Sequence, residues 1–234
     1  AHTHIDYVGS DTPWYLEANE ADAMLRAVER ARFFLECGIT SVRDVGSLGE
    51  VPFRLKEWIS QNRVPGPRIF ACGAYITATG GHGAEGLDIA HPGPAHTRLA
   101  SGQDGWREAV REQFSRGADL IKIGSQFSRE EVRACVEEAH ALGLKVACDA
   151  ETFYIQWAVE AGVDTIEHPL PRTDETIRLM AEMKTAAVPT LIPYIYIFDS
   201  YGGYFGSTSR RFSFSKEANF EVLRRMKRAG VHMG

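Results

Sequence analysis

One pattern of apolar and polar positions recurs along the chain. A charged segment with apolar residues at helical spacing ends at a small residue, usually glycine, and a short apolar run follows at once. In the first such segment, Met24, Val28, Ala31 and Leu35 fall on one face of a helix. The same spacing predicts helices over residues 20–37, 104–117, 128–143, 152–162, 173–184 and 215–229.

The apolar runs are short, as expected for parallel strands buried on both faces. The glycine before most of them is explained by helix termination, because glycine takes the left-handed conformation at no steric cost. The predicted strands lie within residues 2–5, 38–44, 67–72, 117–123, 143–149, 162–168, 187–192 and 230–233. Strict alternation with helices implies parallel strands joined by right-handed crossovers. We therefore predict an α/β fold, a (β/α)8 TIM-type barrel over residues 1–234, with an open doubly wound sheet as the alternative.

Two connections are long in this reading. Residues 78–103 are rich in Gly, His and Pro, and residues 195–214 are rich in Tyr, Phe, Gly and Ser. Both follow predicted strands, so in a barrel both lie on the C-terminal face, where active sites form. Loops of this length usually serve as lids or binding loops.

Composition narrows the classes of function. Hydrophobic residues make up 44% of the 234 residues, enough for a sizeable core. Lys and Arg (26) are outnumbered by Asp and Glu (31), which argues against a nucleic-acid partner. The longest apolar runs are too short for a membrane span. The four widely spaced cysteines favour buried free thiols and a reducing compartment, the cytoplasm being favoured.

Both chain ends are unusual. There is no initiator Met, and residues 230–234 resemble the start of a strand without its end. We therefore treat the sequence as part of a longer protein whose eighth strand is truncated.

Polar side chains cluster where the predicted strands end. His2 and His4 lie on the same face of the first strand, because side chains alternate along a strand, and two imidazoles there can grip one divalent ion. Lys122 lies inside an apolar run, Asp149 ends the next run, and His168 ends the one after. In a barrel these side chains converge on one mouth, which predicts a metal site.

Each residue also has a simpler explanation. A histidine at a strand end is often only hydrogen-bonded, and a lysine in an apolar run can snorkel or pair with a carboxylate. Four predicted strands that carry residues of ligand type favour the metal site over these separate explanations.

The sequence resembles the amidohydrolase superfamily, in particular its imidazolonepropionase-like and Xaa-Pro or Xaa-Arg dipeptidase branch. The resemblance runs through nearly the whole chain. It is carried by the motifs His2-Thr3-His4, Thr79-Gly80-Gly81-His82-Gly83, Ala118-Asp119-Leu120-Ile121-Lys122-Ile123, Ala161-Gly162-Val163-Asp164-Thr165-Ile166-Glu167-His168 and Val188-Pro189-Thr190-Leu191.

This resemblance implies a metal-dependent hydrolase of C–N bonds in amide, peptide-like or cyclic amide substrates. His2 and His4 would bind the first metal, Lys122 would be carbamylated and bridge two ions, and His168 would bind the second. Two zinc ions are implied, with Mn, Fe or Co as alternatives. The partner would be a small molecule, and the sequence leaves a homo-oligomer open.

Two departures from the family pattern affect this prediction. Asp149 stands where the family has histidine, so it is either a ligand in altered geometry or an inactivating change. The chain also stops at Gly234, before the segment in which the family carries its catalytic aspartate, and the family's β-sandwich is absent from it.

Three further residues are candidates for substrate contact. Tyr194 matches the family tyrosine that hydrogen-bonds the substrate, and His82 lies in a glycine-rich loop that could approach it. Arg172, after the sixth predicted strand, could pair with a substrate carboxylate, although a surface ion pair explains it equally. Rival hypotheses are a catalytically impaired barrel that still binds metal, and a metal-independent α/β enzyme.

Overall fold

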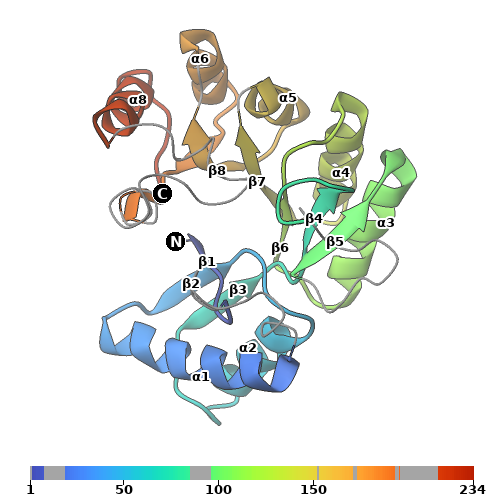
Figure 1. Ribbon diagram of the computed structural model, residues 1–234, viewed down its shortest axis with the longest axis vertical. Coiled ribbons are helices and arrows are strands. Elements are labelled where there is room, and N and C mark those ends of the chain that lie inside the picture. Colours follow the sequence, from blue (N-terminus) through green and yellow to red (C-terminus); the bar gives the residue numbers. More distant parts are fainter. Residues whose placement is uncertain are drawn as a thin grey trace.

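In the computed structural model, strands and helices alternate along the chain. The structure describes residues 2–7, 19–84, 96–151, 153–170, 173–192, 195 and 216–234. Figure 1 shows the helices on the outside and the strands around a common centre. The elements are β1 His2–Thr3, α1 Glu20–Glu36, β2 Ser41–Asp44, α2 Val51–Ser60, β3 Arg68–Ala71, β4 Tyr75–Ala78, β5 Thr97–Ala100, α3 Gly102–Ser115, β6 Leu120–Ile123, α4 Arg129–Ala141, β7 Lys145–Glu151, α5 Phe153–Ala161, β8 Thr165–Leu170, α6 Asp174–Glu182, β9 Ala186–Val188 and α8 Lys216–Arg228.

The strands form two parallel sheets. One has the order β1-β2-β3 and the other has the order β5-β4-β6-β7-β8-β9. A backbone hydrogen bond of 2.8 Å from Asp119 to Ala71 connects the two between β6 and β3. The predicted α/β fold with parallel strands is confirmed, whereas the described strand pairs do not establish closure of the sheets into a barrel.

The predicted helices are confirmed, and so is the way in which they end. Gly117, Gly143 and Gly162 have φ of 92°, 77° and 94°, the left-handed conformation that terminates α3, α4 and α5. At the start of α4, Ser128 accepts a hydrogen bond from the Glu131 backbone, while the Glu131 side chain accepts one from the Ser128 backbone. This reciprocal arrangement is a capping box.

Five features differ from the sequence-based expectation. Helix α2 and strand β4 were not predicted, and β5 lies inside the segment 78–103 that was expected to be a loop. The eighth strand amounts to one parallel bridge between Ala187 and Met233. Cys37 is exposed, whereas Cys72, Cys135 and Cys148 are buried free thiols as expected.

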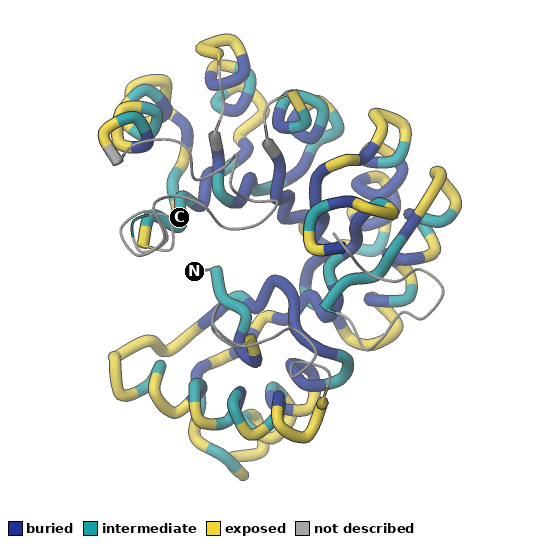
Figure 2. The backbone as a smooth tube through the Cα atoms, viewed as in Figure 1, coloured by how far each residue is buried: buried dark blue, intermediate teal, exposed yellow. Residues whose placement is uncertain are grey.

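The core is divided by the strands into outer and inner parts. Apolar side chains of the larger sheet pack against the helices outside it, including Ile121, Val146 and Ile166. A second cluster joins α1 and α2 to β2 and β3 through residues such as Ala27 and Ile69. Figure 2 shows the buried strands and the exposed outer surfaces of the helices. Among the described helices, none combines the length and apolar character that a bilayer crossing requires.

A small inner cluster determines which side chains face the centre. Val45, Cys72, Leu120 and Ala147 pack together there. Because side chains alternate along a strand, Lys122 and Asp149, two residues after Leu120 and Ala147, point to the same inner side. The inner face is therefore apolar at one level and polar at the next.

The capping box allows the contribution of a helix cap to stability to be tested. We expect Ser128→Ala to lower the free energy of unfolding by about 1 kcal/mol, because it removes a side-chain cap from α4. Urea unfolding would measure the change. Ser115→Ala is the matched control, since Ser115 hydrogen-bonds only a carbonyl within its own helix. An equal loss in both variants would contradict the assignment.

Candidate functional site

His2 and His4 face each other at the amino-terminal end of the chain. Their Nε2 atoms are 3.2 Å apart. His2 Nδ1 lies 2.7 Å from Glu167 Oε2, and His4 Nδ1 lies 2.7 Å from the carbonyl oxygen of Gly46. Each ring is thus fixed through its Nδ1 atom, and its Nε2 atom is directed at the other ring.

The partners of the two Nδ1 atoms determine where the protons lie. A carbonyl oxygen only accepts hydrogen bonds, so His4 Nδ1 carries the proton and donates it to Gly46. Burial, with a further contribution from the Lys122 charge, lowers the pKa of His4 to about 4 and that of His2 well below its usual value. Both rings are therefore neutral at neutral pH. The lone pair of His4 Nε2 therefore faces the His2 ring, and a neutral imidazole nitrogen of this kind can bind a cation.

Glu167 is the buried partner of His2. Its side chain is fully buried. Oε1 accepts hydrogen bonds from Arg43 Nη2 at 2.7 Å and from Thr165 Oγ1 at 2.6 Å, while Oε2 faces His2. Arg43 compensates the negative charge of this carboxylate.

His168 follows Glu167 directly and yet faces the same site. Its φ of 54° is left-handed, which breaks the alternation of the strand. As a result its ring lies 4.6 Å from the ring of His2, in an edge-to-face arrangement. His168 Nδ1 hydrogen-bonds Thr190 Oγ1, and this hydroxyl donates to the carbonyl oxygen of Pro189 at 2.7 Å. The Nδ1 atom is therefore the donor to Thr190.

Asp149 lies between two histidines. Its side chain is buried, and its Oδ2 atom is 3.9 Å from His168 Nε2 and 3.4 Å from His82 Nε2. The His82 backbone is held on both sides. Its N–H donates to Gln126 Oε1 at 2.8 Å, and its carbonyl oxygen accepts from Tyr75 Oη at 3.1 Å.

Steric crowding explains why glycines stand on both sides of His82. A Cβ at Gly83 would overlap the Tyr75 hydroxyl, and one at Gly81 would lie 2.5 Å from Thr77 Oγ1. Gly83 also has a φ of 79°. The loop can therefore pass this close to β4 only without side chains at these positions.

Lys122 projects from β6 to the inner side and is only 3% exposed. Its charge contributes to the lowered pKa of both His2 and His4. Within the described ranges, no hydrogen bond or ion pair involves its side chain. A buried ammonium group without such a partner is unusual, because burial of an unpaired charge is costly.

The structure thus brings six of the predicted residues into one region. These are His2, His4, His82, Lys122, Asp149 and His168. Tyr194 and Arg172 lie outside the described residues. Among the residues that the structure describes, no group of three or more His, Cys, Asp and Glu side chains is arranged to hold an ion. The predicted ligand set therefore remains a prediction.

Several neighbours of the site were not predicted from the sequence. Glu167, Arg43, Thr190 and the Gly46 carbonyl all hold a histidine or its partner. Glu167 lies within a predicted strand, directly before the predicted ligand His168, and a charged residue at such a position was a signal that could have identified it.

A further buried carboxylate, that of Asp44, lies beside the chain segment that follows His4. Asp44 Oδ1 accepts hydrogen bonds of 2.8 Å from the Ile5 backbone and from Ser47 Oγ. Asp44 Oδ2 has no hydrogen-bond partner in the described part of the chain. Burial, assisted by the nearby Asp6 charge, raises the pKa of Asp44 to about 7.

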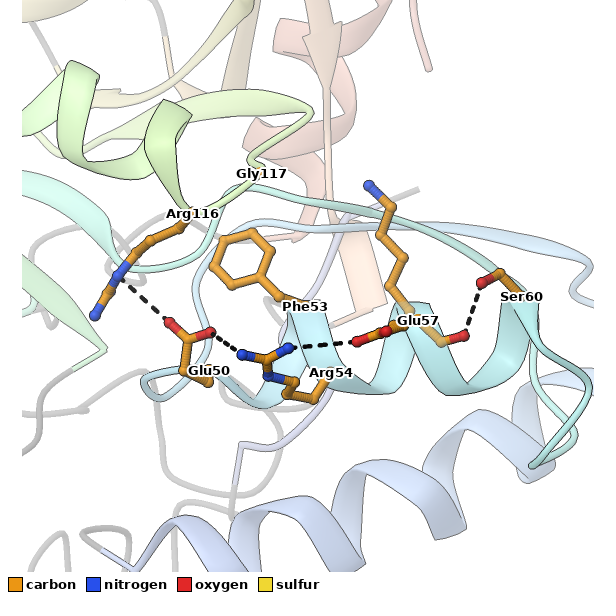
Figure 3. Close-up of a pocket in the computed structure, with 8 residues that line it drawn as sticks. Glu50, Phe53, Arg54, Glu57, Ser60, Arg116 and Gly117 are labelled. Atoms are coloured by element: carbon orange, nitrogen blue, oxygen red, sulfur yellow. Dashed lines mark hydrogen bonds and ion pairs between the residues drawn. The ribbon is translucent and has the colours of Figure 1, made fainter.

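A groove of about 390 Å³ lies elsewhere, between α2 and the turn before β6. Figure 3 shows Glu50 between Arg54 and Arg116, with ion-pair distances of 3.7 Å and 3.5 Å. Its charges are largely paired with one another, and none of the predicted site residues lines it. We therefore place the candidate site at the histidines.

Comparison with known proteins identifies a family for most of the chain. The amidohydrolase family matches residues 1–197. An ochratoxinase of Aspergillus niger is 27% identical over 225 residues, with 81% of this chain and 46% of the relative covered. The chain thus spans about half the length of that curated relative.

Among the solved structures that resemble the whole chain are a prolidase and a dipeptidase. A prolidase complexed with N-methylphosphonate-L-proline has a TM-score of 0.86 and 30% identity, and the match covers 100% of this chain and 62% of that one. A Xaa-Pro dipeptidase with bound methionine has a TM-score of 0.85 and 27% identity, covering 100% and 63% respectively.

Asp44 makes stability depend on pH in a defined direction. Its pKa is raised from 3.8 to about 7 in the folded protein. Between these values the unfolded chain releases the proton and the folded chain keeps it, so this group lowers stability as pH rises. The Asp44→Asn variant lacks this titrating group. We therefore expect its free energy of unfolding, relative to that of wild type, to rise by about 3 kcal/mol from pH 5 to pH 8.

Urea unfolding at both pH values would measure this difference. His4 has the opposite effect on stability, because its lowered pKa makes the free energy of unfolding fall as pH falls from 6.5 towards about 4. Both proteins contain His4, so the difference between them is free of this effect. Glu108→Gln, an exposed carboxylate, is the control. The same pH dependence in wild type and Asp44→Asn would argue against a proton on Asp44.

Proposed function

Because the chain belongs to the amidohydrolase family, we propose that the protein is a metal-dependent hydrolase of a C–N bond in an amide, peptide-like or cyclic amide substrate. The observation that carries this proposal is the pair of facing Nε2 atoms of His2 and His4, 3.2 Å apart. Nitrogen ligands about 2.0–2.1 Å from one tetrahedral zinc ion lie about 3.3–3.4 Å apart. The separation of the two nitrogens therefore suits a common ion.

The proposed ligands divide between two divalent ions. His2 and His4 would hold the first, and His168 with Asp149 would hold the second. Zinc suits this set of imidazole and carboxylate donors, as do Mn, Fe and Co. When bound, such ions polarise the scissile carbonyl and lower the pKa of a shared water molecule.

Lys122 is the proposed bridge between the ions. Reaction of its neutral amine with CO2 forms an N–C bond and releases one proton, which leaves a carbamate anion. A carbamate at this position would replace an unpaired buried cation by an anion among neutral imidazoles. The lack of a described partner for Lys122 supports this proposal.

The substrate would be held by residues at the rim. We assign His82 to substrate contact, because its backbone is fixed on both sides while its ring is directed to Asp149. Tyr194 and Arg172, both outside the described residues, remain candidates for the substrate carbonyl and carboxylate. The prolidase and dipeptidase relatives favour dipeptides and N-acyl amino acids as the first substrates to test.

Asp149 is the basis of a second hypothesis, a catalytically impaired protein that still binds metal. The family has histidine at this position, so the chain could bind one ion and lack turnover. Against this, Asp149 is buried beside His168 and His82, as expected for a working ligand. The two hypotheses differ in metal content and in the effect of changing Asp149.

Metal analysis tests the main proposal. We expect close to two divalent ions per chain in the purified protein and hydrolysis of dipeptides or N-acyl amino acids. His4→Gln should remove at least one ion, because it replaces a ligand nitrogen, whereas His140→Gln, at an exposed ion pair with Asp164, should keep both. Protein without any divalent ion after reconstitution would reject the proposal.

Replacement of Asp149 separates the two hypotheses. If Asp149 is a working ligand, Asp149→His should lose both metal content and activity, since the longer ring meets His82 and His168. If Asp149 is an inactivating change, the same variant should gain both. Elemental analysis and the turnover of N-acyl amino acids would be measured on the same samples.

A further inference from the structure

Three hydrogen-bonding groups converge on the buried carboxylate of Glu167. Glu167 receives Arg43 Nη2 at 2.7 Å and Thr165 Oγ1 at 2.6 Å on Oε1, and His2 Nδ1 lies 2.7 Å from Oε2. Arg43 Nη1 also donates to Thr165 Oγ1 at 3.1 Å, which directs the Thr165 hydroxyl proton to Glu167. The carboxylate thus acts as an acceptor on both oxygens.

This arrangement decides which nitrogen of His2 carries the proton. The guanidinium of Arg43 only donates hydrogen bonds, so Glu167 Oε1 must be the acceptor of its bond. Oε2 remains for His2 Nδ1, which must therefore donate. The lone pair then lies on His2 Nε2, which faces His4 Nε2 at 3.2 Å.

The alternative tautomer would have a different outcome. A proton on His2 Nε2 would point at His4 Nε2, whose own Nδ1 proton is committed to the Gly46 carbonyl. The two rings would then hydrogen-bond each other, and His2 would present no lone pair to an ion between them.

We propose that Glu167, held by Arg43, is a positioning residue that selects the Nδ1-protonated tautomer of His2 and keeps its Nε2 atom available for a divalent ion. The metal part rests on the proposed function, whereas the tautomer is a property of the metal-free protein. Carboxylates that hold a ligand histidine in this way raise metal affinity in other proteins.

The strands explain why Glu167 can take this role. His2 and Arg43 are register partners in β1 and β2, so their side chains share one side of the smaller sheet. Glu167 and Thr165 lie two residues apart in β8, on one side of the larger sheet. The carboxylate therefore links the two sheets at the site.

The test uses Glu167→Gln, which keeps the shape of the side chain. Glutamine has one acceptor oxygen, which Arg43 and Thr165 would take, so its amide N–H would face His2 Nδ1. We expect His2 to move its proton to Nε2 and Co²⁺ affinity to fall about 10- to 100-fold. Side-chain 15N NMR of the metal-free protein at pH 8 reports the tautomer, with the His2 signals assigned from His2→Gln.

Thr165→Val is the matched control. It removes a donor to Oε1 and leaves Oε2 and His2 untouched, so tautomer and Co²⁺ affinity should match wild type. A purely structural role of the network would instead affect both variants alike.

Two results would overturn the inference. One is wild-type His2 protonated at Nε2 in the metal-free protein, which decides the matter even if Glu167→Gln does not fold. The other is a folded Glu167→Gln protein with an unchanged tautomer and Co²⁺ affinity. If wild type shows the Nδ1 proton but binds no Co²⁺, the proposed function fails while the tautomer assignment stands.

Discussion

A buried negative charge is costly unless its oxygens are filled by donors, and Glu167 places this constraint at the centre of the site. Its donors come from both sheets: His2 and Arg43 from the smaller one, Thr165 from its own strand. Loss of Arg43 would leave the buried negative charge without its compensating cation. The positions of β1 and β8 relative to each other are thereby coupled to the orientation of one imidazole ring.

The rest of the inner face follows from strand alternation. Leu120 and Ala147 belong to the small apolar cluster at the centre, and Lys122 and Asp149 lie one level above it. The outward-facing residues of the same strands pack against the helices. A change from apolar to polar side chains along the inner face separates the part that stabilises the sheet from the part that is available for chemistry.

Most of the helices and strands could be predicted from the sequence, because helix-terminating glycines and short apolar runs depend on local chemistry. Helix α2 was not predicted because no glycine marks its end. Asn62, with a φ of 57°, takes the left-handed conformation there instead. Strand β5 follows a segment rich in Pro, Gly and His, whose composition is typical of a loop.

The ligand-type residues were found because they lie at strand ends, but their partners were not. Glu167 and His168 are neighbours in sequence, and alternation would direct them to opposite sides. Only the left-handed backbone of His168 brings both to His2, and a histidine carries no sequence signal for that conformation. The Gly46 carbonyl is equally invisible in the sequence, because any residue has one.

The backbone hydrogen bonds that fix His82 have a consequence for how the site can change in evolution. Its backbone N–H and carbonyl are bound by Gln126 and by Tyr75 of β4, so its place is set by the sheet and the segment after β6. Both of these contacts use main-chain atoms of residue 82, so they do not depend on which side chain it carries. The side chain beside Asp149 can therefore change in evolution while the backbone that presents it keeps its position.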